Sequence, residues 1–268
     1  MKILIIGGGN MGLTYAQSFQ RSHISSKEDM MILEKSEEKA AELALKDIGT
    51  VYSRPEDCLE SADLVIFAVK PQDSATLFAS LRSMADPQQV FLSIMAGIRI
   101  KAIMDALGVR KVIRAMPNLP AQIGMGMTAF TSSDDVTRIE LVMVQNLLNT
   151  TGKTVYVEKE EAIDAATAIS GSGPAYVWFF MKALMDAARE MGFNYSEAEL
   201  LVSQTFRGAI ELFSKTDFTC EEWIEKVCSR GGTTEAALAS YRKNLVRDDI
   251  MAGAVAALNR AVELGQDR

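Results

Sequence analysis

The sequence predicts a mixed α/β protein in which a doubly wound parallel sheet is followed by an all-helical region. Short apolar runs alternate with amphipathic stretches through the first half, which is the rhythm of βα units. A glycine cluster, GGGNMG, directly follows the first apolar run and opens a helical stretch. From Glu160 onward the strand patterns stop. This change of structural class places a domain boundary near residue 158.

The individual elements follow from periodicity and capping signals. Six apolar runs have the length of buried parallel strands, at 2–6, 30–33, 49–52, 63–69, 90–95 and 111–115. Two late edge strands are expected around a helix at 134–149, at 127–130 and 153–157. Ser36 is a candidate N-cap, and capping-box patterns occur at Ser196–Glu199 and Thr219–Glu222. Two final helices are expected at about 234–243 and 247–264.

Composition narrows the class of protein. With 48% apolar and 24% charged residues, the 268-residue chain has enough apolar side chains for a real core. A formal net charge of −7 argues against nucleic acid as the main partner. The apolar runs are too short to span a membrane, and MKILII reads as a strand instead of a secretory signal.

The cysteines and the histidine exclude several kinds of site. Cys58, Cys220 and Cys228 have neither metal-ligand spacing nor a plausible disulfide framework, so a cytoplasmic location and no metal are expected. The single histidine, His23, lies near the end of the first helical pattern and is expected at the surface. A histidine-based triad or metal site is therefore hard to build.

The first glycine cluster predicts a dinucleotide-binding site. Gly7, Gly9 and Gly12 form G-x-G-x-x-G between a strand and a helix, where they permit a tight turn, close approach of a pyrophosphate and close helix–strand packing. Glu34 ends the second strand and is placed to accept hydrogen bonds from a ribose 2′-hydroxyl. Lys35 beside it would instead attract a 2′-phosphate. NADH and NADPH both remain open, with a slight preference for NADH.

A second glycine pair, in SRGGTTEAAL (229–238), opens a helix in the C-terminal half. Such a helix start offers free N–H groups and a positive dipole end to an anion. An ordinary cap between packed helices is the alternative interpretation.

Five motifs occur in the order and spacing of one enzyme family. They are AVKP (68–71), MAGI (95–98), RAMPNLP (114–120), AISGSGPAYV (168–177) and GGTTEAAL (231–238). The whole chain resembles pyrroline-5-carboxylate reductases, which carry out the last step of proline synthesis. The resemblance implies a Rossmann domain at 1–158 and an all-α substrate-binding and dimerisation domain at 159–268. It also implies a homodimer that completes each active site, and in some members a ring of dimers.

The resemblance assigns residues to the cofactor. Val69, Lys70, Pro71 and Ala96 are expected to line it, together with the glycine loop. The full expected cofactor set is Gly7, Gly8, Gly9, Asn10, Met11, Gly12, Glu34, Lys35, Ala68, Val69, Lys70, Pro71 and Ala96. The glycines and proline of 171–174 have two compatible interpretations, a bend in a long helix and close approach to nicotinamide and substrate.

The resemblance also implies the chemistry, hydride transfer from NAD(P)H to the C=N bond of a cyclic imine that carries a carboxylate. Thr234 is the expected catalytic residue, hydrogen-bonded to the ring nitrogen. The expected substrate contacts are Glu160, Ser229, Gly231, Gly232, Thr233 and Thr234. Two positions depart from the family pattern, Arg230 where proline is usual and Pro55 where many members have asparagine. A reductase of a related imine or small carbonyl acid, and a non-catalytic nucleotide-binding paralogue, are the alternatives.

Overall fold

The computed structural model describes residues 1–266, which form two compact units. The first unit comprises Met1–Ser172 together with the chain from Ala257 onward, and the second comprises Gly173–Ala256. The expected boundary near residue 158 lies earlier in the chain than this packing division, because the helix after it buries Ile163 and Asp164 within the first unit. The assignment of functions to 1–158 and 159–268 stays a prediction.

The first unit contains one eight-stranded sheet with the order β3-β2-β1-β4-β5-β6-β7-β8. Its strands are β1 (Ile3–Ile6), β2 (Met30–Leu33), β3 (Thr50–Tyr52), β4 (Leu64–Phe67), β5 (Val90–Ser93), β6 (Val112–Met116), β7 (Gly126–Ser132) and β8 (Gly152–Tyr156). Strands β1 to β6 are parallel, β7 is antiparallel to β6, and β8 is parallel to β7. The order of the first six strands is that of a doubly wound dinucleotide-binding sheet, as predicted.

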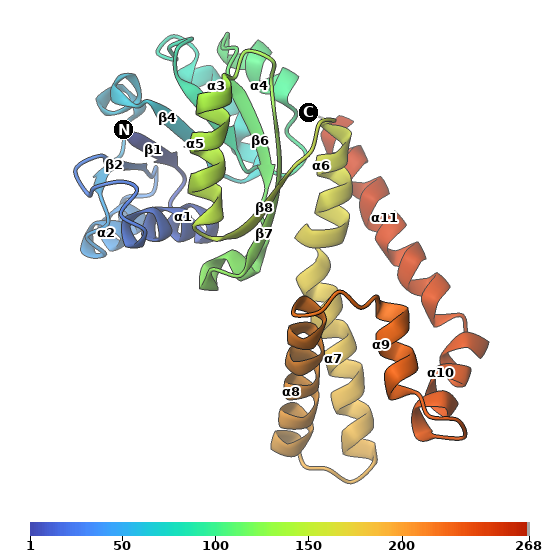
Figure 1. Ribbon diagram of the computed structural model, residues 1–268. Coiled ribbons are helices and arrows are strands. Elements are labelled where there is room, and N and C mark those ends of the chain that lie inside the picture. The colour runs from blue at the N-terminus through green and yellow to red at the C-terminus, as the bar shows by residue number, and fades with distance from the viewer. Residues whose placement is uncertain (267–268) are drawn as a thin grey trace. The chain divides into compact units, whose positions relative to one another are not determined.

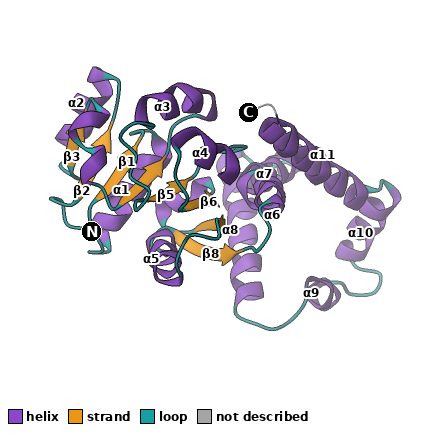
Figure 2. Ribbon diagram, turned by 90° about the horizontal axis from the view of Figure 1, so that it is seen from above, coloured by secondary structure: helices purple, strands orange, loops and turns teal. Residues whose placement is uncertain are grey.

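Helices cover both faces of this sheet (Figures 1 and 2). On one face α1 (Asn10–Arg21), α2 (Glu37–Leu45) and α5 (Arg138–Asn149) contribute to one apolar cluster with the strands. On the other, α3 (Ser74–Leu81) and α4 (Ile100–Leu107) contribute to a second cluster. Short 3-10 turns occur at Pro55–Asp57, Leu59–Ser61, Pro71–Asp73 and Leu119–Ile123. Strands β1, β2, β4 and β5 are buried on both faces, which explains their continuous apolar sequences.

After β8 the chain is helical. In the first unit, α6 (Glu161–Ala166) runs into a π-helical turn (Thr167–Gly171), and the last turns of α11 (Val246–Gln266) return to this unit. The second unit contains α7 (Gly173–Glu190), α8 (Tyr195–Ser214), α9 (Cys220–Val227), α10 (Thr233–Lys243) and the first part of α11. Within it α7 and α8 pack side by side (Figure 1).

The second unit buries little of its apolar surface. Ala198 and Val202 are the buried residues of α8, and α7 has none. Trp178 is 53% exposed and Phe179 is 72% exposed. Among residues 1–266, none of the helices combines the length and the apolar character that crossing a bilayer requires. The exposed apolar face of α7 and α8 is the kind of surface that a second protein chain covers.

Several local predictions are confirmed. The Ser36 hydroxyl accepts the N–H of Lys39 at the start of α2, and Thr219 and Glu222 form a reciprocal capping box before α9. His23 is exposed and follows the C-cap of α1.

Two local predictions are wrong. The capping box of α8 is formed by Asn194 and Glu197, because the same pattern occurs two residues earlier and leaves Ser196 inside the helix. β7 is not an edge strand, because β8 pairs with its outer side and forms the edge instead.

Candidate active site

The glycine loop between β1 and α1 is shaped by close backbone contacts. Gly7 has φ +105°, and a Cβ on it would lie 2.8 Å from the Ala68 carbonyl oxygen. A Cβ on Gly12 would lie 2.0 Å from the Gly7 carbonyl oxygen. A Cβ on Gly9 would instead meet nothing within 4 Å. Gly7 and Gly12 are therefore needed for packing, whereas Gly9 keeps the space beside the loop open.

The start of α1 supplies free donors at this open space. Gly9 is the N-cap, without a side-chain cap, and the N–H of Leu13 makes the first helical hydrogen bond, to the Gly9 carbonyl at 2.9 Å. The preceding N–H groups, of Asn10, Met11 and Gly12, have no intrahelical acceptor. Such a helix start binds a phosphate group.

Glu34 joins this loop to the next helix. Its carboxylate follows β2 and accepts the N–H of Gly8 through Oε2 at 3.1 Å and the N–H of Ser36 through Oε1 at 3.0 Å. Its exposed fraction is only 9%. Because both oxygens are held by backbone N–H groups, the carboxylate is fixed in orientation at the end of β2.

A pocket of about 590 Å³ lies beside these groups. It is lined by residues that follow β1, β2 and β4, whose carboxyl ends share one edge of the parallel sheet. Seven of the predicted cofactor residues line it: Gly7, Gly9, Glu34, Lys35, Ala68, Val69 and Lys70. The others lie outside its lining: Gly8, Asn10, Met11 and Gly12 in the loop and first turn of α1, Pro71 at the start of a 3-10 turn, and Ala96 after β5. The glycine cradle, the free helix start and the pocket fit a dinucleotide.

The pocket lining also contains residues that the sequence pattern did not indicate. They are Lys39, Ser53, Asp73, Thr76, Leu77 and Ser80, beside the noted Pro55. Lys35 Nζ lies 3.5 Å from Asp73 Oδ1. Lys39 lies in the first turn of α2 and donates its N–H to the Ser36 hydroxyl, so the N-cap signal at Ser36 is what could have indicated a second cation near the pocket.

The second glycine pair, in the second unit, forms a helix start of a different kind. Gly231 has φ +73°, and its N–H donates to Glu235 Oε2 at 2.7 Å. A Cβ on Gly232 would lie 2.5 Å from the Ser229 Oγ and 2.9 Å from its carbonyl oxygen. Both glycines are therefore required by the local backbone, and the close approach to a substrate that the sequence suggested for them stays a prediction.

The first turn of α10 has unused donors. Gly232 is its N-cap, and the N–H of Ala236 makes the first helical hydrogen bond, to the Gly232 carbonyl. The N–H groups of Thr233 and Thr234 precede that bond and lack an intrahelical acceptor. Within residues 1–266, no side chain caps this helix. Ser229 and Thr233 are exposed and Thr234 is half-buried. The start of α10 therefore has the free N–H groups and positive dipole end that favour an anion.

Arg230 is exposed, and among residues 1–266 it has no ion-pair partner. A free guanidinium beside an unused helix start adds positive charge to the same surface.

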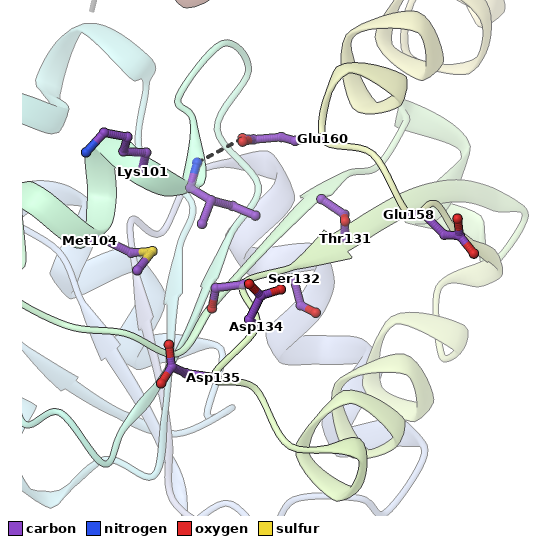
Figure 3. Close-up of a pocket in the computed structure, with 10 residues that line it drawn as sticks. Lys101, Met104, Thr131, Ser132, Asp134, Asp135, Glu158 and Glu160 are labelled. Atoms are coloured by element: carbon purple, nitrogen blue, oxygen red, sulfur yellow. Dashed lines mark hydrogen bonds between the residues drawn. The ribbon is translucent and has the colours of Figure 1, made fainter.

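Glu160 is bound within the first unit. Its Oε1 accepts the N–H of Ile100, the first residue of α4, at 2.8 Å (Figure 3). The same oxygen lies 3.0 Å from Nη1 of buried Arg114. Arg114 Nη2 lies 2.6 Å from Oδ1 of Asp164, which is also buried. These bonds connect β6, α4 and α6, a structural role that the sequence prediction for Glu160 did not include.

Glu160 also borders a separate pocket of about 300 Å³, with Asp134, Asp135 and Glu158 at its rim (Figure 3). The carboxylates make this pocket unsuited to a substrate anion.

Comparisons with known proteins agree with this layout. Residues 160–264 match the family model for pyrroline-5-carboxylate reductase dimerisation, and residues 2–97 match that for NADP oxidoreductase, coenzyme F420-dependent. The pyrroline-5-carboxylate reductase of Aquifex aeolicus is 36% identical over 236 residues, which cover 87% of this chain and 86% of the relative. That of Pseudomonas aeruginosa is 30% identical over 270 residues, with 99% and 98% covered.

Solved structures show the same similarity over the full length. The Plasmodium falciparum pyrroline carboxylate reductase with NADP bound has a TM-score of 0.88 and 27% identity, and 99% of this chain and 98% of that chain are covered. The Coxiella burnetii pyrroline-5-carboxylate reductase has a TM-score of 0.90 and 28% identity, with 98% of each chain covered. The chain therefore belongs to the pyrroline-5-carboxylate reductase family of NAD(P)H-dependent oxidoreductases.

Proposed function

We propose that the protein reduces 1-pyrroline-5-carboxylate to L-proline with NADH or NADPH. The observation that carries the proposal is the α10 start, where two required glycines leave the N–H groups of Thr233 and Thr234 free for a carboxylate. The two relatives described above match 87% and 99% of this chain, and both are named pyrroline-5-carboxylate reductase. Cofactor binding is proposed for residues 1–158, and substrate binding with dimerisation for residues 159–268.

The protein binds the substrate and orients its C=N bond for the reaction. The substrate carboxylate binds the α10 start, where the Ser229 and Thr233 hydroxyls and the Gly231–Gly232 backbone surround it. Thr234 then faces the ring nitrogen and donates a hydrogen bond to it as the C=N bond is reduced. The bound nicotinamide supplies the hydride. The hydrogen bond from Thr234 activates the neutral imine, and the nitrogen takes its proton from solvent through that hydroxyl, so this scheme needs no catalytic histidine.

For the dinucleotide, the pocket at the ends of β1, β2 and β4 accepts the adenosine half. Its pyrophosphate binds the N–H groups at the start of α1, with Gly9 leaving the space free. Val69, Lys70, Pro71 and Ala96 are assigned to the same cofactor by their place after β4 and β5.

NADH is the proposed preferred nucleotide. The fixed Glu34 carboxylate lines the pocket and repels a 2′-phosphate, while Lys35 lies near Asp73 and is partly neutralised by it. Lys39 and Lys70 also line the pocket and have no carboxylate partner among residues 1–266, and these two cations favour NADPH.

Glu160 is proposed to act through structure. Its Oε1 already accepts hydrogen bonds from the Ile100 N–H and from Arg114. These bonds favour a structural role for Glu160 over the substrate contact that the resemblance implied. A homodimer formed through α7 and α8, and a ring of such dimers, remain the proposed assembly, in the cytoplasm. The exposed apolar side chains of these helices support the dimer.

A steady-state assay tests the proposal. Purified protein is mixed with pyrroline-5-carboxylate and either NADH or NADPH, nucleotide oxidation is followed by absorbance, and proline is quantified. Oxidation with proline formation is expected, with NADH the better nucleotide. A folded sample that oxidises neither nucleotide overturns the assignment, and faster turnover of another cyclic imine or carbonyl acid would redirect it.

A further inference from the structure

The π-helical turn at Thr167–Gly171 contains a carbonyl whose helical partner is missing. The N–H of Ser172 donates to the Thr167 carbonyl at 2.9 Å, five residues back, which defines the wide turn. In a regular helix the Ser170 carbonyl would accept the N–H of residue 174. That residue is Pro174, which has no N–H and whose ring crowds this carbonyl. The SGSGP sequence therefore creates a vacant acceptor.

Asn118 supplies the missing donor. Its Nδ2 donates to the Ser170 carbonyl at 3.0 Å, and its Oδ1 accepts the N–H of Met127 at 2.9 Å. The orientation of the amide is forced, because a flipped amide would place two acceptors together at Ser170 and two donors together at Met127. Asn118 follows β6 and belongs to the RAMPNLP sequence. Two motifs that lie 52 residues apart are thus joined by one side chain.

The same strand end holds this segment at two further points. Arg114 in β6 binds Asp164 in α6, and both side chains are buried. A Cβ on Gly171 would lie 3.1 Å from Cε of Met116, the last residue of β6. The contacts of Asp164 and Gly171, on either side of Ser170, therefore fix where the π-helical turn lies relative to the sheet.

We propose that Asn118 is a positioning residue for the reduction, because its amide replaces the N–H that Pro174 lacks and so holds the bent turn in place. This inference rests on the proposed function and on the interpretation of residues 171–174 as approaching the nicotinamide and the substrate. Asn118 itself need not touch either one. Its loss changes the alignment of the reacting groups and leaves the nucleotide pocket at β1, β2 and β4 intact.

The test removes the amide donor of Asn118 and keeps its acceptor oxygen. Asn118→Asp keeps an acceptor for Met127 and places a carboxylate oxygen against the Ser170 carbonyl. The expected result is a fall in kcat of about tenfold, corresponding to one lost hydrogen bond, with the KM for NADH unchanged. Asn149→Asp is the matched control, since Asn149 Oδ1 accepts from the Thr154 hydroxyl and a carboxylate can do the same. Asn118→Ala removes the donor without adding charge and serves if Asn118→Asp fails to fold.

A double-mutant cycle with Pro174→Ala separates positioning from general structure. Alanine restores an N–H that can bond the Ser170 carbonyl, so Asn118→Ala should cost markedly less kcat in the Pro174→Ala background than in the native protein. Equal losses in both backgrounds overturn the proposal. So does an unchanged kcat in the Asn118 variants, or a KM for NADH that rises in parallel with the loss of kcat.

Hydrogen exchange of the amides of 167–172 tests the same bond without any substrate. Faster exchange in Asn118→Ala and native exchange in Asn149→Asp are expected. Unchanged exchange in Asn118→Ala overturns the positioning role. A native protein that does not reduce pyrroline-5-carboxylate would overturn the proposed function while this exchange result still decides whether Asn118 holds the turn.

Discussion

The two glycine-rich helix starts use the same backbone chemistry but are assembled differently. In each, a glutamate carboxylate accepts a glycine N–H, Glu34 from Gly8 and Glu235 from Gly231. The first pair is separated by 26 residues and the second by four. The start of α1 is therefore a tertiary construction that depends on neighbouring strands. The start of α10 is local, because its hydrogen bonds within the described part of the chain join positions between 229 and 236.

This difference predicts different consequences of substitution. Substitutions at the start of α1 should affect folding or nucleotide affinity. Gly7 is packed against the Ala68 backbone and Gly12 against the Gly7 backbone, whereas Gly9 faces the open space. Change at the α10 start should affect substrate handling, since its residues are exposed or half-buried and support little of the core.

The largest effect on turnover is expected from Thr234→Ala. Loss of the hydroxyl at the imine nitrogen should lower kcat by about a hundredfold, as removal of a proton-donating group does. Steady-state kinetics with pyrroline-5-carboxylate measure kcat, and fluorescence titration with NADH measures the affinity for the nucleotide. Thr234→Ser is the control that should retain most of the turnover. If NADH affinity alone fell, the role given to Thr234 would be wrong.

A matched glycine pair separates packing from ligand space at the α1 start. Gly12→Ala places a methyl group against the Gly7 carbonyl and should destabilise the protein by about 1–3 kcal/mol. Gly9→Ala meets no protein atom, so its stability should be native while its affinity for NADH falls by about tenfold, because the methyl group enters the phosphate site. Urea unfolding and NADH titration measure the two quantities. Native NADH affinity in Gly9→Ala would contradict the assigned phosphate site.

Gly232→Ala tests the α10 start. The added methyl group would meet Ser229, so the loop must shift and the KM for pyrroline-5-carboxylate should rise by about tenfold. NADH affinity should stay native, which distinguishes this site from the first. Gly253→Ala is the control, since a Cβ there meets nothing within 4 Å. A substrate KM that does not change would remove the loop from the carboxylate site.

The smallest effect is expected at Glu34. Glu34→Ala should shift the ratio of NADPH to NADH efficiency upward by about fivefold, because a fixed negative charge leaves the pocket. Glu38→Ala, on the first turn of α2, is the control. Comparison of kcat/KM with both nucleotides gives the ratio. An unchanged ratio would show that Glu34 only holds Gly8 and Ser36.

Much of the fold was predictable because its signals are local. The parallel strands have continuous apolar sequences, and the caps at Ser36 and Thr219 involve partners three residues away. Where two equally good local patterns lay close together, as at Asn194 and Ser196, sequence alone gave the wrong one. The position of β7 also required the structure, because the side on which β8 pairs depends on the path of the chain after α5.

The candidate site likewise has features that could be predicted from the sequence and features that required the structure. Sequence by itself determined the two glycine-rich helix starts, since glycine, threonine and their spacing dictate the backbone there. The tertiary structure alone decided that Glu34 holds Gly8, that Glu160 binds Arg114, and that Asn118 serves the carbonyl opposite Pro174. The reason is the distance along the sequence between the bonded residues. A helix start satisfies its groups within one turn, whereas these partners become neighbours only when the sheet brings distant strands and helices together.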